Sequence, residues 1–194
     1  MQYTKNKFTS LEGKILVASP RLEDRFFEKS LIYIFMHDEN GALGIILNQV
    51  IGSVSNQELL KLLDKTTVRI TDSKSPIVFG GPVNTEKVIA LSINKEQEKN
   101  FSHLQSITLH TDIQDFIKDC ILKNTTSKFL LVRGVSAWDS GQLEDEIAQN
   151  TWFISNPNID LIFSQQIKDK WSSVIKSMGL LKNSAYIAPY TGNA

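Results

Sequence analysis

Short runs of apolar and β-branched residues recur along the chain. Apolar runs without polar alternation are typical of strands that are covered on both faces, because a strand with one face in water alternates apolar and polar residues. The buried strands are predicted at residues 15–18, 31–36, 43–47, 77–79, 87–93, 106–109, 128–137 and 151–154. A further short edge strand is expected at residues 67–70.

A second pattern, apolar residues spaced three and four positions apart, predicts helices. Ser55 and Glu58 have the spacing of a capping box, and Thr111 or Asp112 can cap the helix that follows them. Asn40-Gly41 tolerates the positive φ of a tight turn, which predicts a hairpin between the second and third strands. The helices are expected at residues 56–63, 113–121, 140–148 and 167–178, the last ended by Gly179.

Size and composition fit one domain over residues 1–194. The 194 residues are 41% hydrophobic and 22% charged, which is ordinary for a globular protein. A body of this size buries roughly 70% of the surface of its unfolded chain. Because strands and helices interleave, the expected class is a mixed α/β (α+β) fold.

The charge balance and the single cysteine indicate which kinds of partner and which cellular compartment to expect. Twenty-one Lys and Arg against 21 Asp and Glu give no basic excess, which argues against a nucleic-acid partner. Cys120 is expected to be a buried core thiol, and one thiol is typical of a reducing compartment. The first ten residues are polar, and the longest apolar run is far short of the ~20 residues of a membrane helix. We therefore expect a cytoplasmic protein without a membrane partner.

The most informative stretch is residues 133–147, where an apolar strand passes through small residues into an acidic helix. Asp139 is expected to cap that helix, with the Gln142 side chain returning to the cap amide. The stretch is either a structural strand-to-helix corner or a binding site. Arg133 follows four apolar residues, so we expect its guanidinium to be buried in an ion pair with Glu144 or Glu146 rather than to hold a substrate.

The sequence contains no recognised motif for a metal site or a cofactor. His37, His103 and His110 lack the spacing of metal ligands. No phosphate-binding glycine loop and no Gly-x-Ser-x-Gly turn is present, so neither a nucleotide enzyme nor an α/β-hydrolase nucleophile is predicted. We expect no metal, no cofactor and no assigned catalytic residue.

A set of motifs resembles the AlgH-like (YqgE-type) family of small bacterial proteins across nearly the whole chain. The set comprises residues 13–20, Phe27 with Ser30, residues 37–48, residues 79–83, Gly134, Trp138, residues 141–144, Trp171 and Gly192 with Ala194. The resemblance implies a bifurcated or partly barrel-like sheet surrounded by helices. It implies no established activity, although some members are described as transcriptional regulators. The chain departs from the family pattern at Arg25, Val50, Val135, Ala137, Asp139 and Ser140.

The residues favour a non-enzymatic binding or regulatory protein whose partner is another protein or a small ligand. The expected binding surface combines three turn-rich motifs. The alternative is a small hydrolase-like enzyme that uses carboxylates near Trp138, such as Asp139 and Glu144. The surface residues are Ser19, Pro20, Gly80, Gly81, Pro82, Trp138, Asp139, Gly141, Gln142 and Glu144.

Overall fold

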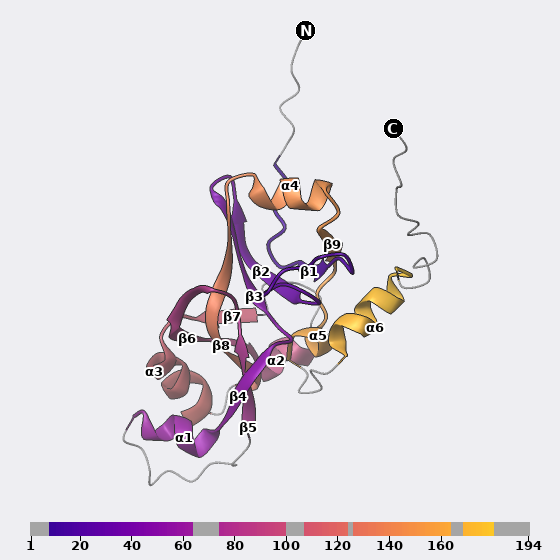
Figure 1. The fold of residues 1–194 in the computed structure, drawn as a ribbon. Helices are drawn as coiled ribbons and strands as arrows, with labels where there is room; N and C mark the ends of the chain where they lie inside the picture. The colour runs from indigo at the N-terminus through magenta and orange to yellow at the C-terminus, as the bar shows by residue number, and fades with distance from the viewer. Residues whose placement is uncertain (1–7, 64–73, 100–106, 124–125, 164–168, 181–194) are drawn as a thin grey trace, which may run out of the picture.

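One long strand organises the fold. In the computed structural model, which describes residues 8–63, 74–99, 107–123, 126–163 and 169–180, strand β8 (Thr126–Asp139) belongs to two parts of one sheet (Figure 1). Its first part pairs in parallel with β5 (Lys74–Phe79) and antiparallel with β6 (Val83–Asn94). Its last four residues pair with β3 (Gly41–Ile46). The nine-stranded mixed sheet is therefore bifurcated, and it is not closed into a barrel.

The two halves of the sheet divide the remaining strands between them. In the first half, β3 is followed across the sheet by β2 (Leu31–Asp38), β1 (Ile15–Ala18) and β9 (Trp152–Ser155). In the second half, β4 (Val50–Ser55) lies beside β5, and β7 (Ile107–His110) lies beside β6. The hairpin predicted around Asn40-Gly41 is confirmed, because Asp38 pairs with Gly41.

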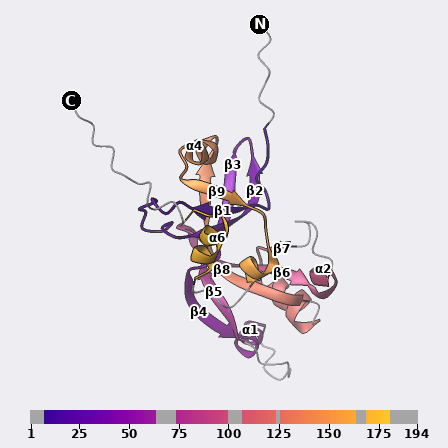
Figure 2. The ribbon, with the colours of Figure 1, turned by 90° about the vertical axis from the view of Figure 1, so that its right-hand side faces the viewer.

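Three apolar clusters hold the layers together. The largest contains residues of both sheet halves together with α5 (Ile159–Phe163) and α6 (Lys170–Ser177). The second joins the first half to α4 (Gln142–Ala148), which lies across one end of the molecule (Figures 1 and 2). The third joins the second half to α1 (Asn56–Lys61), α3 (Ile113–Phe116) and the π-helix that follows it (Ile117–Leu122). The halves therefore face each other across the main core.

The halves meet where two glycines allow two backbones to approach closely. Gly80 follows β5, and its N–H donates to the Arg133 carbonyl at 2.9 Å. A Cβ on Gly80 would collide with the carbonyl oxygen of Gly134, which itself has a positive φ of 74°. Only glycine accepts both conditions without strain. The junction of the two halves therefore requires these residues.

A bulge in β2 changes which side chains face which layer. The pairing of β2 with β3 shifts between Ile34 and Met36, so Phe35 is an extra residue. Such an insertion reverses the alternation of side chains beyond it. As a result Tyr33 packs in the main core between the halves, whereas His37 contacts α4 on the opposite face.

Several sequence predictions need correction or completion. Helix 113–121 has four α-helical residues and then continues as a π-helix. The helix predicted to start at residue 140 begins at Gln142. Strand β4, α2 (Lys95–Lys99) and α5 were not predicted, because their patterns are short and partly polar. The capping box at Ser55 and Glu58 is confirmed by both of its hydrogen bonds.

Some predictions fall on residues outside those described. These are the edge strand at residues 67–70, the start of the last helix at residues 167–168, His103, and the side chain of Cys120. Gly179 has the left-handed φ of 75° that was expected after the last helix. Within the described residues, no helix is long and apolar enough to cross a membrane.

Candidate functional site

The Trp138 corner is a packed structural junction. Trp138 is 6% exposed, and its indole N–H donates to Oε2 of Glu146 at 2.9 Å. Trp152 is 3% exposed and donates to the same oxygen at 2.6 Å. The Phe27 ring stacks on Trp138 and meets Trp152 edge-on. Because both indoles are buried and hydrogen-bonded, their rings hold a strand against a helix.

The start of α4 differs from the expected cap. The Gln142 side-chain oxygen accepts the backbone N–H of Asp139 at 3.0 Å, as predicted. Asp139, however, is the last residue of β8, and the N-cap position belongs to Gly141, which has a φ of 77°. A side chain at Gly141 would be strained by that backbone conformation. The prediction that Asp139 caps the helix is therefore wrong.

Glu144 holds a buried histidine rather than an open catalytic position. The His37 side chain is 1% exposed, and its Nε2 lies 2.9 Å from Oε1 of Glu144. Its Nδ1 accepts the backbone N–H of Leu11 at 2.9 Å. This hydrogen-bond pattern assigns the ring proton to Nε2. Both ring nitrogens are thus used to connect the segment before β1, strand β2 and helix α4.

The prediction that Arg133 is buried in an ion pair is wrong. Arg133 is exposed, and its Nε donates to the backbone carbonyl of Thr85 at 2.6 Å. The preceding apolar run misled the prediction, because the Arg133 side chain is exposed although its neighbours in β8, Val132 and Gly134, are buried. Glu146, one of the two expected partners of Arg133, instead accepts the hydrogen bonds of the Trp138 and Trp152 indoles.

The expected surface contains both buried and exposed residues. Ser19, Gly80, Gly81 and Trp138 are buried, and Ser136 donates to the Gly80 carbonyl at 3.0 Å. The exposed members are Pro20, Pro82, Asp139, Gly141, Gln142 and Glu144.

Two adjacent phenylalanines in the loop after β1 link parts of that expected surface. Phe26 stacks on Phe79, which precedes Gly80, and Phe27 stacks on Trp138. The loop is shaped by Asp24, whose carboxylate accepts the backbone N–H groups of both phenylalanines. The loop thus packs against both the Gly80 turn and the Trp138 corner.

A second histidine pair lies in the second half of the sheet. Ser92 Oγ and His110 Nε2 lie 2.8 Å apart, and the imidazole packs against Phe116. Burial lowers the pKa of His110, and the charge of Asp119 opposes that shift. Ser92, near the end of β6, is only 4% exposed, so its hydroxyl is not open to a substrate. In the described part of the chain, no group of three metal-ligating side chains comes together.

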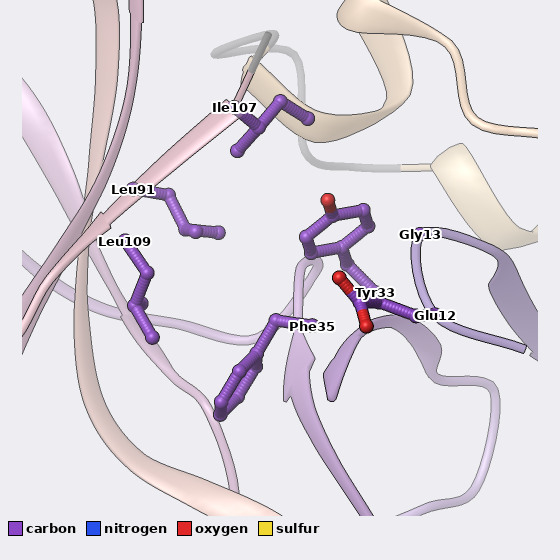
Figure 3. Close-up of a pocket in the computed structure, with 7 residues that line it drawn as sticks. All are labelled: Glu12, Gly13, Tyr33, Phe35, Leu91, Ile107 and Leu109. Atoms are coloured by element: carbon purple, nitrogen blue, oxygen red, sulfur yellow. The ribbon is translucent and has the colours of Figure 1, made fainter. Parts of the chain in front are cut away.

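A cavity between the two sheet halves offers a different site. It has a volume of about 340 Å³, within the roughly 300–1,000 Å³ of small-molecule sites. One wall comes from β2 and the loop before β1, and the other from β6 and β7 (Figure 3). The lining residues are Glu12, Gly13, Tyr33, Phe35, Leu91, Ile107 and Leu109.

Two polar side-chain groups lie on one side of this cavity. Figure 3 shows the Tyr33 hydroxyl and the Glu12 carboxylate on the side opposite Leu91 and Leu109. Burial, and then the charge of Glu12, raise the pKa of Tyr33 to about 12. The phenol therefore stays protonated at neutral pH, where it can both donate and accept a hydrogen bond.

Sequence reasoning missed this cavity. Tyr33 belongs to an apolar run that predicted only a core strand, and Glu12 lies in a short polar segment before β1. The opposite wall comes from residues 56 to 97 positions later in the chain. No local signal in the sequence relates the two walls.

These features define an α+β protein with a bifurcated mixed sheet and a small cavity of mixed polar and apolar lining between its halves. Residues 15–182 match the family model described as AlgH-like, so the chain belongs to the AlgH-like family. The resemblance noted from the motifs is thereby confirmed.

Curated relatives agree with this assignment. A UPF0301 protein of Shewanella loihica is 34% identical over 171 residues, which cover 88% of this chain and 92% of that protein. A UPF0301 protein of Buchnera aphidicola is 33% identical over 178 residues, which cover 89% and 92%.

Two solved structures share the fold. The solution structure of the AlgH protein from Pseudomonas aeruginosa aligns over 100% of both chains with a TM-score of 0.64 and 23% identity. The crystal structure of protein DIP2367 from Corynebacterium diphtheriae aligns over 88% of both chains with a TM-score of 0.64 and 20% identity.

Proposed function

We propose that this protein is a non-enzymatic binding or regulatory protein, and that a small ligand occupies the cavity between the two halves of its sheet. The observation that carries the proposal is the cavity itself, which has mostly apolar walls and two polar groups on one side. Such a site combines area for hydrophobic burial with a few groups that orient the ligand. Leu91 and Tyr33 in its walls belong to the main core, so the site is largely preformed.

The position of the cavity also suits a regulatory role. Its walls belong to different sheet halves, which are joined through β8. A ligand that contacts both walls favours one relative arrangement of the halves. By linkage, any partner that prefers the same arrangement binds more tightly when the ligand is present.

The alternative of an enzyme that uses Asp139 and Glu144 has weaker support. Glu144 is bonded to His37, and Asp139 lies at an exposed strand end. Neither carboxylate lines the cavity. The exposed members of the expected surface stay candidates for a protein partner.

A titration with 1-hexanol tests the cavity as a ligand site. The alcohol has about seven non-hydrogen atoms, and about 0.5 kcal/mol for each gives a Kd in the low millimolar range. We expect saturable NMR shifts of the methyl groups of Leu91, Ile107 and Leu109. Shifts that grow linearly without saturation, or that occur equally all over the protein, would contradict the proposal.

A pair of matched variants separates the cavity from nonspecific binding. Leu109→Trp places a larger side chain in the cavity wall and is expected to abolish saturable binding. Leu62→Trp makes the same change at the C-cap of α1, at a residue that is 54% exposed and does not line the cavity. Hexanol must bind the Leu62→Trp protein like the parent, and equal binding to both variants would refute this location of the site.

A further inference from the structure

We infer that the cavity prefers a cationic amphiphile, a ligand with an apolar body and an ammonium end that lies against Glu12. This inference rests on the proposed function, since it assigns the chemistry of the ligand for that same cavity. It follows from the charge of the lining, the aromatic rings in the wall, and the engagement of the nearby lysines elsewhere.

The charge of the cavity lining is negative. Glu12 is the one charged residue among those that line the cavity, and the other members are apolar, glycine or tyrosine. Figure 3 shows its carboxylate on the same side of the cavity as the Tyr33 hydroxyl. A carboxylate attracts a cation and repels an anion, and the effect grows where water is partly excluded. The phenol oxygen of Tyr33 can accept a further N–H from an ammonium group.

Nearby cations do not neutralise Glu12. Lys14, two residues along the chain, donates its Nζ to Asn156 Oδ1 at 2.8 Å. Lys128 on β8 pairs with Glu98 at 2.8 Å and lies 3.8 Å from Asp160. Among the residues that the structure describes, no basic side chain is within ion-pair distance of Glu12.

Two aromatic rings add to the preference. Tyr33 and Phe35 both line the cavity, and both come from the strand that carries the bulge. An aromatic face attracts a cation, and the attraction grows where the pair is desolvated. Because Glu12 itself is exposed, its own contribution is that of a modest surface pair. Together these effects predict about a five- to tenfold preference for the cation over a neutral ligand of equal length.

Three probes of equal chain length test the inference at pH 7. We expect 1-hexylammonium to bind about five- to tenfold more tightly than 1-hexanol, and hexanoate to bind about tenfold more weakly than 1-hexanol. The advantage of hexylammonium should shrink on addition of 0.5 M NaCl, because salt screens exposed charges. Equal or weaker binding of hexylammonium than of hexanol would overturn the inference.

Variants of two exposed glutamates test whether the tighter binding of hexylammonium depends on Glu12. Glu12→Gln is expected to remove the advantage of hexylammonium while the Kd of hexanol stays the same. Glu23→Gln removes the same charge from an exposed residue that does not line the cavity, and the advantage must persist. If Glu12→Gln keeps the advantage, the inference fails and the binding function stands. If none of the three probes binds the parent protein, both fail.

Discussion

Glu146 is the single acceptor for two buried indoles, so its removal should cost far more stability than removal of an ordinary surface glutamate. In the Glu146→Ala variant, the N–H groups of Trp138 and Trp152 lose their acceptor. A buried donor left without a partner costs about 1–3 kcal/mol, so two donors cost about 2–6 kcal/mol. Glu146 itself is only partly buried, so water can reach part of the vacated space. We therefore expect a loss of about 3 kcal/mol in the free energy of unfolding.

The isosteric variant Glu146→Gln tests the geometry of this contact. Both indoles donate to one oxygen, Oε2, so a single amide oxygen in its place can accept both hydrogen bonds. The charge assistance is lost, and the new amide group faces the Gln142 side chain, which now donates to Oε1 at 2.8 Å. We expect a loss of about 1 kcal/mol, clearly smaller than that of Glu146→Ala.

Urea unfolding followed by far-ultraviolet circular dichroism measures these changes, and the NMR signals of the two indole N–H groups report the local effect. Asp145→Ala is the matched control, since Asp145 is exposed on the same helix and its loss should stay within about 0.5 kcal/mol. A Glu146→Ala protein as stable as that control would refute the reasoning. Equal losses in Glu146→Ala and Glu146→Gln would show that charge, and not acceptor position, matters.

Three other substitutions give distinct outcomes in the same unfolding assay. Lys170 is 6% exposed, its Nζ donates to the Leu161 carbonyl at 2.9 Å, and burial lowers its pKa from 10.5 to about 8. Lys170→Met should therefore be about 1 kcal/mol more stable than the parent at pH 7. The folded parent binds fewer protons than the unfolded chain between these pKa values, so its stability should rise relative to the variant from pH 8 to 10.5, and a constant difference would contradict this. Ser55→Ala breaks the capping box with Glu58 and should cost about 1 kcal/mol, whereas an unchanged denaturation midpoint would show that α1 needs no cap. Arg133→Met should change the free energy of unfolding by less than about 1 kcal/mol, because Arg133 is exposed. A loss of about 3 kcal/mol or more would instead support the rejected hypothesis that Arg133 is buried in an ion pair.

Local signals in the sequence predicted the features that depend on neighbouring residues. The capping box, the Asn40-Gly41 hairpin and the left-handed Gly179 each involve residues within a few positions of one another. The Gln142 side chain returns to the amide of Asp139 over the same short range. Such interactions form wherever the backbone takes the expected local conformation, so residue type and spacing suffice to predict them.

Arg133 and His37 show where local reasoning fails. The apolar residues before Arg133 predict burial, yet Arg133 is exposed although its neighbours in β8, Val132 and Gly134, are both buried. His37 lies in a strand whose alternation is reversed by the bulge at Phe35, and the bulge exists because of how β2 pairs with β3. Which face of the sheet a side chain takes depends on the strands it pairs with elsewhere in the chain, so the sequence of the strand alone does not predict it.

The candidate site could not be predicted at all from the chain pattern. By itself the sequence determined the family, the mixed α/β class and most elements, because apolar periodicity, caps and turns act over a few residues. Only the tertiary structure placed Glu12 and Tyr33 opposite Leu91 and Leu109, and joined Trp138 to Glu146 and Trp152. The reason is that the sharing of β8 between two sheet halves is a long-range pairing, and the cavity is the space left between the halves.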